Sequence, residues 1–154
     1  MGRLAELAER YGVTRAAEFG LAGLVGFAVA EAVIIGGLFL ADGTLQVPSG
    51  YSSSPSLFVL DVSAFVVGVT MGFFVNERTT VRDAPGRESG GRRGTAVRLA
   101  KYQGVYVLGN AITIGTQLAL LAAFALSPAL GVLVGAVVAY PVSYVVSMKF
   151  VWRV

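Results

Sequence analysis

Residues 19–40 read Phe19-Gly-Leu-Ala-Gly-Leu-Val-Gly-Phe-Ala-Val-Ala-Glu31-Ala-Val-Ile-Ile-Gly-Gly-Leu-Phe-Leu40. At about 1.5 Å per helical residue this apolar run reaches roughly 33 Å, which is enough to cross a hydrocarbon core of about 30 Å. It therefore predicts a transmembrane helix. One residue of the run, Glu31, is ionisable, and it lies near the middle, where a bare charge is costly. We expect Glu31 to face protein or water, or to be protonated.

The composition of the whole chain agrees with a membrane protein. Of its 154 residues, 55% are hydrophobic and only 14% are charged, values that are unusual for a soluble domain of this size. The chain has no cysteine and no histidine. These absences exclude disulfides and thiolate metal sites, and they remove the commonest general base and metal ligand. We expect no enzyme activity, no cofactor and no metal site.

Three further apolar runs are each long enough to span a membrane: 57–75, 104–126 and 129–148. Residues 41–56 between the first two runs are rich in Gly, Ser and Pro, which is typical of a polar loop. Only Ser127 and Pro128 separate the last two runs, so these should form a tight helical hairpin. The sequence thus predicts an all-α integral membrane protein with four transmembrane helices.

Every basic residue lies at one side of this arrangement. Seven are in the connection 76–103: Arg78, Arg82, Arg87, Arg92, Arg93, Arg98 and Lys101. The other five precede the first run or follow the fourth: Arg3, Arg10, Arg15, Lys149 and Arg153. The positive-inside rule makes this side, with both termini and Arg92, cytoplasmic, and it puts Ser53 outside. We expect a multi-pass protein of the cell (plasma) membrane whose basic face meets anionic lipid, and no nucleic-acid partner, because no nucleic-acid-binding motif is present.

The segment before the first run has a helical pattern of its own. Leu4, Leu7, Ala8 and Tyr11 share one face of a helix over residues 1–15. This pattern indicates either a short amphipathic helix on the membrane surface or a solvated lead-in. We therefore divide the chain into an amino-terminal segment, 1–14, and a four-helix transmembrane domain, 15–154.

The two halves of the domain resemble each other at their ends. Arg15-Ala-Ala-Glu-Phe19 before the first run is similar to Arg98-Leu-Ala-Lys-Tyr102 before the third. Phe73-Phe-Val-Asn76-Glu-Arg78-Thr-Thr-Val81 after the second run is similar to Tyr144-Val-Val-Ser147-Met-Lys149-Phe-Val-Trp152 after the fourth. This pattern indicates an internal duplication, with repeats of about 15–81 and 98–152. Because each half has two spans and begins inside, the halves should be parallel-repeat helical hairpins.

At these segments the chain resembles the GtrA-like family of small four-helix membrane proteins. The family closes each hairpin with a pattern like Phe-x-x-Asn-Arg-x-Trp-x-Phe, which Phe73, Asn76 and Arg78 match in the first half. In the second half Lys149, Phe150 and Trp152 keep the basic and aromatic character, while Ser147 replaces Asn. The resemblance implies a role in polysaccharide or glycoconjugate assembly, namely translocation of polyprenyl-phosphate-linked sugars or an accessory role in it.

Polar residues within the apolar runs are the candidate substrate-binding positions. Tyr106, Asn110, Thr113 and Gln117 share a narrow stripe of the third helix, which lipid cannot satisfy. Tyr140, Tyr144 and Ser147 repeat the arrangement beside Pro141, which we expect to kink the fourth helix. The predicted substrate-binding set combines these with the first half: Glu31, Asn76, Arg78, Asn110, Thr113, Gln117, Tyr140 and Tyr144. The predicted lipid-phosphate set is Arg15, Arg98 and Lys149.

Two other functions, and a packing role, stay open. Glu31 would also suit a small proton-coupled multidrug-type exporter, and a membrane anchor for a glycosyltransferase would need no polar path. Polar helix residues also form interhelical hydrogen bonds, and rows of small residues let helices pack closely. Such rows are 22/26/30, 64/68/72 and 131/135/139. Because these rows offer more packing surface than one four-helix unit needs, we expect a homo-oligomer.

Overall fold

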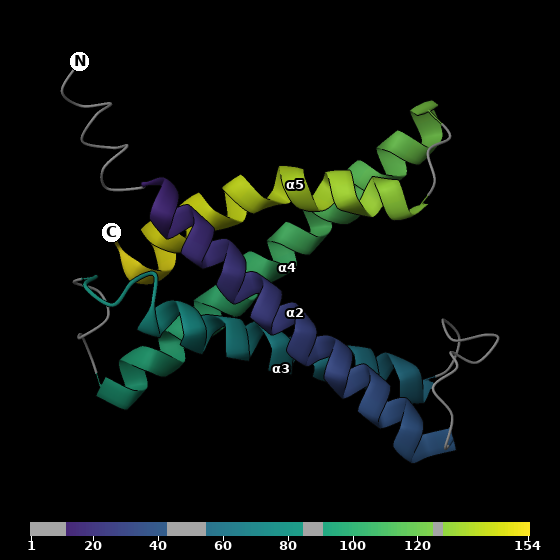
Figure 1. The fold of residues 1–154 in the computed structure, drawn as a ribbon, viewed down its shortest axis with the longest axis horizontal. Helices are drawn as coiled ribbons and strands as arrows, with labels where there is room; N and C mark the ends of the chain where they lie inside the picture. Colours follow the sequence, from purple (N-terminus) through teal and green to yellow (C-terminus); the bar gives the residue numbers. More distant parts are fainter. Residues whose placement is uncertain (1–11, 43–54, 85–90, 125–127) are drawn as a thin grey trace. The chain divides into compact units, whose positions relative to one another are not determined.

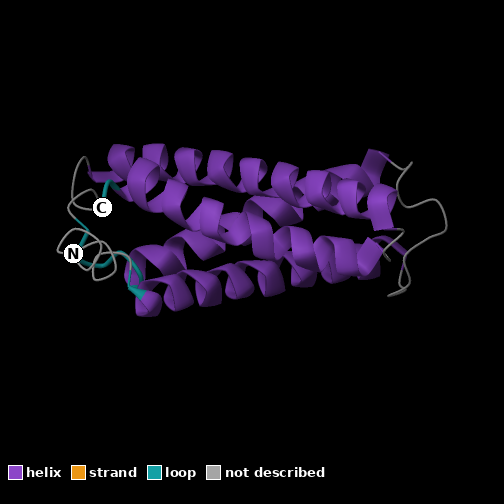
Figure 2. Cartoon of the chain, turned by 90° about the horizontal axis from the view of Figure 1, so that it is seen from above, coloured by secondary structure: helices purple, strands orange, loops and turns teal. Residues whose placement is uncertain are grey.

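The computed structural model of the chain describes residues 12–42, 55–84, 91–124 and 128–154. These residues form helices α2 (Val13–Asp42), α3 (Pro55–Arg78), α4 (Gly91–Phe124) and α5 (Pro128–Val146), followed by the π-helix η2 (Ser147–Trp152) (Figure 1). The described ranges contain no strand (Figure 2). Each α-helix is long and apolar enough to cross a membrane. The prediction of an all-helical protein with four membrane-spanning helices is confirmed, whereas the predicted amino-terminal segment, 1–14, lies mostly outside the described residues.

Helix α4 extends well beyond the apolar run from which it was predicted. It begins at Gly91, whereas the apolar run begins at Gly104. Residues 91–103 contain Arg, Ala, Leu, Lys and Gln, which all favour helix, so the helix continues past the apolar boundary. The 34 residues of α4 correspond to roughly 51 Å, against about 30 Å of hydrocarbon. The first turns of α4, which carry Arg92 and Arg93, therefore extend beyond the length that a membrane span requires.

The chain forms two compact units. The α2–α3 unit comprises Glu18–Thr80, and the α4–α5 unit comprises Met1–Ala17 with Val81–Val154. The first turn of α2 thus groups with α4 and α5 rather than with the rest of its own helix. The chain passes from one unit to the other at residues 17–18 and again at residues 80–81.

Glycines bring α2 and α3 together at backbone distance. A Cβ atom added at Gly26 would lie 2.6 Å from the carbonyl oxygen of Gly68, and one added at Gly68 would lie 2.6 Å from the carbonyl oxygen of Gly26 and 2.8 Å from Ala30 Cβ. Gly37 lies against the Leu60 side chain farther along the hairpin. Because residue numbers rise along α2 as they fall along α3, the two helices are antiparallel. The small-residue rows 22/26/30 and 64/68/72 serve this packing, as the sequence predicts.

The α4–α5 hairpin is built in the same way. A Cβ atom at Gly135 would lie 2.6 Å from the Thr113 carbonyl oxygen, and one at Gly131 would lie 2.9 Å from Gln117 Cγ. Gly109 faces the Ser143 hydroxyl in turn, at 2.7 Å from an added Cβ. Small residues on both helices therefore let the backbones approach. Since the small-residue rows are used inside the hairpins, the expectation of a homo-oligomer no longer draws support from them.

Candidate functional site

The basic end of the α4–α5 unit holds a cluster of aromatic side chains. Tyr102 of α4 and Trp152 of η2 are fully buried, and their ring centroids lie 5.3 Å apart. The Tyr102 hydroxyl donates a hydrogen bond to the Tyr106 hydroxyl, at 3.0 Å. Such aromatic pairs add stabilisation beyond the area that they bury. The cluster fixes the end of the chain against the first turns of the α4 span.

The second closing segment forms η2 rather than a continuation of α5. Pro141 lies inside α5, which continues as α-helix to Val146 before the π-helical turns begin. Ser147, Met148, Val151 and Trp152 are buried, whereas Lys149 and Phe150 between them are exposed. The hydroxyl oxygen of Ser147, at the position where the GtrA-like pattern has Asn, has no hydrogen-bond partner among the described residues. π-Helical turns are frequent at functional sites, so η2 is a candidate part of the site.

Two basic side chains, Arg98 and Lys101, lie in the part of α4 that precedes Tyr102. Arg98 is only 6% exposed, and its guanidinium donates to the Thr95 hydroxyl at 3.1 Å. Lys101, which the predicted site omits, donates to the Phe150 carbonyl at 3.5 Å and lies 5.9 Å from the centroid of the Phe150 ring. Residues three apart on a helix are neighbours, so Lys101 lies next to the buried Arg98 along α4. The sequence signal was present, because Lys101 lies inside the repeated segment 98–102.

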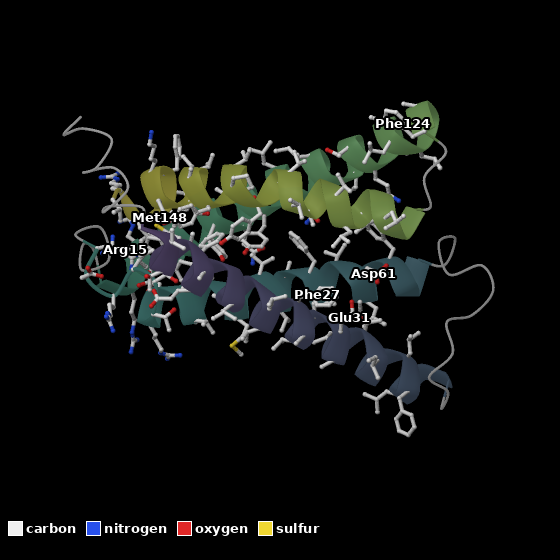
Figure 3. All side chains as sticks on the ribbon, turned by 45° about the horizontal axis from the view of Figure 1, so that its top comes forward. Arg15, Phe27, Glu31, Asp61, Phe124 and Met148 are labelled. Atoms are coloured by element: carbon white, nitrogen blue, oxygen red, sulfur yellow. The ribbon has the colours of Figure 1, made fainter. Side chains whose placement is uncertain are left out.

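Arg15, a predicted phosphate ligand, is engaged within the chain. Its guanidinium forms an ion pair with Asp83 at 2.6 Å. The next residue of α2, Ala16, accepts a hydrogen bond through its carbonyl from the Tyr140 hydroxyl. Figure 3 labels Arg15 and Met148 at the end of this unit where the chain leaves α5. Tyr140, a predicted substrate residue, therefore has a structural bond that holds the first turn of α2.

The first closing segment is also satisfied internally. Asn76 is fully buried, and its side-chain oxygen accepts a hydrogen bond from the Thr80 hydroxyl at 2.8 Å. Phe73 is fully buried as well, whereas Arg78 is exposed. The buried amide of Asn76 thus stabilises the turn that follows α3. Of the predicted pair, only Arg78 presents its side chain at the surface.

The predicted polar stripe of α4 divides into two parts. Thr113 and Gln117 lie against α5, and the Thr113 hydroxyl donates to the Gly109 carbonyl of its own helix at 3.1 Å. Asn110, by contrast, is exposed. The reason is the helical pitch: Asn110 is turned about 100° from Gly109, and Gly109 faces α5. Tyr144 of α5 is buried, as expected for the inner face of that helix.

Two acidic residues of the α2–α3 unit, Glu31 and Asp61, lie far from these basic groups along the sequence. Glu31 and Asp61 are half-buried. Figure 3 shows both in the half of the hairpin that leads to the connection between α2 and α3. Glu31 follows Ala30, which contacts Gly68 at the closest approach of the two helices. Its carboxyl group is therefore neither sealed in the helix contact nor fully exposed on the surface.

The comparisons with known proteins agree with the sequence motifs. No curated protein and no solved structure matches the chain significantly. A family model described as the GtrA/DPMS transmembrane domain matches residues 18–152, which covers all four membrane-spanning helices and both closing segments. The chain therefore belongs to the GtrA/DPMS transmembrane-domain family and is a multi-pass membrane protein involved in glycoconjugate synthesis.

Proposed function

We propose that this protein translocates polyprenyl-phosphate-linked sugars across the plasma membrane, or assists that step, without itself making or breaking covalent bonds. The observation that carries the proposal is the charge of the α4–α5 unit. Its described part contains eight basic side chains, Arg15, Arg82, Arg92, Arg93, Arg98, Lys101, Lys149 and Arg153, and one acidic side chain, Asp83. A lipid whose head carries a phosphate matches such a surface beside a membrane span.

Translocation also requires polar groups that the sugar can contact inside the membrane, and half-buried polar side chains support this. A translocator must offer hydrogen-bonding groups within the membrane, where lipid offers none. Glu31 in α2 and Gln117 in α4 have side chains that are neither fully buried nor fully exposed. Such side chains can accept hydrogen bonds from sugar hydroxyls.

Transport in reconstituted vesicles tests the function. We expect the wild-type protein to accelerate the transbilayer movement of a fluorescent polyprenyl-phospho-sugar, measured as the loss of its outer-leaflet fluorescence to an impermeant quencher. Glu31→Gln should retain most of that rate, because a glutamine still hydrogen-bonds sugar hydroxyls. Protein-free vesicles are the control for spontaneous movement.

The same vesicles separate the alternatives. Uptake of a quaternary ammonium dye under a pH gradient, lost in Glu31→Gln, would contradict lipid translocation and identify a proton-coupled exporter. Transport of neither probe would contradict both and favour an anchor for a glycosyltransferase. Wild-type and variant vesicles are compared at equal amounts of folded protein.

The membrane topology is a separate proposal with its own test. If the four helices cross the membrane in turn, both termini and the α3–α4 connection lie on the side where all the basic residues gather. The chain has no cysteine, so single cysteines report position cleanly. We expect an impermeant maleimide to label Ser53→Cys in intact cells and to label Arg92→Cys only after the membrane is opened. Labelling of Arg92→Cys in intact cells would contradict a cytoplasmic α4 start.

A further inference from the structure

The first turn of α2 groups with the α4–α5 unit although it buries no side chain there. Residues up to Ala17 belong to that unit, whereas the helix from Glu18 onward belongs to the α2–α3 unit. Residues 12–17 are all described, and none of them is buried; Val13 is 88% exposed. The first buried side chain of α2 is that of Phe19, in the other unit. Apolar burial therefore contributes little to the position of this turn.

Polar contacts from two other segments hold the turn instead. The Tyr140 hydroxyl of α5 donates a hydrogen bond to the Ala16 carbonyl, and the Arg15 guanidinium pairs with Asp83 at 2.6 Å. The side chain of Asp83 is 61% exposed, and ion pairs that reach solvent are weak. The Ala16 carbonyl also accepts the helical N–H four residues on, so it keeps a partner when Tyr140 moves away. Both contacts can therefore break without leaving a buried polar group unsatisfied.

The second connection between the units is anchored by burial. The chain returns to the α4–α5 unit at residues 80–81, and the side chains of Val81 and Ala84 on this side are buried. The Ala84 N–H donates to the Val81 carbonyl at 3.0 Å, which closes the turn. Moving this segment would expose apolar surface. The two connections thus differ in what holds them, polar contacts at residues 13–17 and apolar burial at residues 81–84.

Within each unit the helices are in close backbone contact. Gly26 meets Gly68 between α2 and α3, and Gly135 meets Thr113 between α5 and α4. Separating either pair of helices would lose dispersion contacts along the hairpin. Releasing the first turn of α2 breaks polar contacts that water can replace. The easiest structural change is therefore expected at this turn rather than inside a hairpin.

We propose that residues 13–17 of α2 form a releasable strap. In the closed state, Tyr140 and Asp83 hold the strap on the α4–α5 unit. In the released state the strap stays helical and moves with the rest of α2, and residues 80–84 remain as the hinge between the units. Rigid-body movement of one repeat against another is the usual basis of alternating access in transporters. The strap thus gives the α2–α3 hairpin a controlled freedom that the proposed function does not itself specify.

Distances between spin labels test the strap, because the chain has no cysteine of its own. Val13→Cys in the strap and Lys149→Cys in η2 are both at exposed positions. They are labelled together in nanodiscs that each hold one copy of the full chain, and their separation is measured by double electron–electron resonance. We expect two distances in this otherwise wild-type chain, one for the closed strap and one for the released strap.

Removing either contact should favour the released distance. We expect Tyr140→Phe, which deletes only the hydroxyl, to raise the ratio of released to closed strap about fivefold, as for one neutral hydrogen bond. Asp83→Asn should raise the ratio about threefold, as for an exposed ion pair. Arg82→Gln is the charge control, because it removes a neighbouring exposed charge of the same turn and should leave the ratio unchanged.

Salt separates the two contacts. Raising the ionic strength from about 0.1 M to about 1 M shortens the screening length from about 10 Å to about 3 Å. The released fraction should therefore rise with salt in the wild type and in Tyr140→Phe, where the ion pair is present. It should not change with salt in Asp83→Asn. An equal response to salt in all three proteins would contradict a role of the Arg15–Asp83 pair in the strap.

A second label pair verifies that the fold is intact. Leu40→Cys and Phe58→Cys lie at exposed positions of α2 and α3, and their separation should stay narrow and unchanged in every variant. A single strap distance that neither Tyr140→Phe nor Asp83→Asn alters would overturn the proposal. Broadening of the Leu40–Phe58 distance in Tyr140→Phe would overturn it as well, because the hydroxyl would then stabilise the whole fold rather than the strap.

Discussion

Gly68→Ala is expected to destabilise the α2–α3 hairpin by about 1–3 kcal/mol, the usual cost of overpacking. The new Cβ would lie 2.6 Å from the Gly26 carbonyl oxygen and 2.8 Å from Ala30 Cβ. Neither neighbour is the end of a flexible side chain, so the helices must move apart to accept the methyl group. The separation also weakens the dispersion contacts on which helix association in a membrane depends. The free energy of unfolding in bicelles, measured for wild type and variant, gives the cost directly.

Gly36→Ala is the matched control in α2. A Cβ at Gly36 meets no atom within 4 Å, so alanine there should leave stability unchanged or raise it by up to about 1 kcal/mol through helix propensity. Gly135→Ala and Gly115→Ala form a matching test and control in the α4–α5 unit. A Cβ atom added at Gly135 would lie 2.6 Å from the Thr113 carbonyl oxygen, whereas one added at Gly115 would meet no atom within 4 Å. Equal effects at Gly68 and Gly36 would contradict close backbone packing.

Trp152→Ala should have a still larger effect, a loss of about 3–5 kcal/mol, which is the range for deleting a buried aromatic side chain. Trp152 is fully buried and packs on Tyr102, so the substitution leaves a cavity where η2 meets α4. We expect a lower thermal unfolding midpoint in detergent and release of η2 to proteolysis. Trp152→Phe, which keeps an aromatic ring, should recover much of the lost stability.

Phe150→Ala tests whether the effect of Trp152→Ala comes from the burial of the ring or only from its place in η2. Phe150 lies in the same π-helical segment and has an aromatic ring, but it is 67% exposed. Its replacement should change the unfolding midpoint little, since little of the side chain is removed from solvent or lipid on folding. A similar loss of stability for Phe150→Ala and Trp152→Ala would contradict the packing described for η2.

The close helix contacts show which polar residues of α4 take part in packing. Thr113 and Gln117 contact the glycines of α5, and Thr113 donates its hydrogen bond to its own helix. Their position supports the packing role that the sequence left open for the α4 stripe.

The two closing segments differ in how their polar groups are bonded. Asn76 and Ser147 occupy corresponding positions, yet Asn76 accepts a hydrogen bond from Thr80 and the Ser147 hydroxyl has no partner among the described residues. In the first half the residues after Arg78 form a turn, whereas in the second the corresponding residues form η2. Thr79, Thr80 and Val81 replace the aromatic residues of the family pattern there, and Thr80 supplies the bond that closes the turn.

The sequence by itself determined the four helices, because length and apolarity are sufficient to fill a membrane span and each span forms its backbone hydrogen bonds internally. It also determined the family, through the closing segments, and the small-residue rows that bring α2 to α3 and α4 to α5. Only the tertiary structure decided which polar side chains are bonded to which partners within the chain. The Arg15–Asp83 ion pair joins residues 68 positions apart, the Lys101–Phe150 contact joins residues 49 apart, and Asn110 is turned away from the helix that Gly109 contacts. Periodicity fixes the face of a helix on which a residue lies, but the partner that meets this face depends on packing between distant segments.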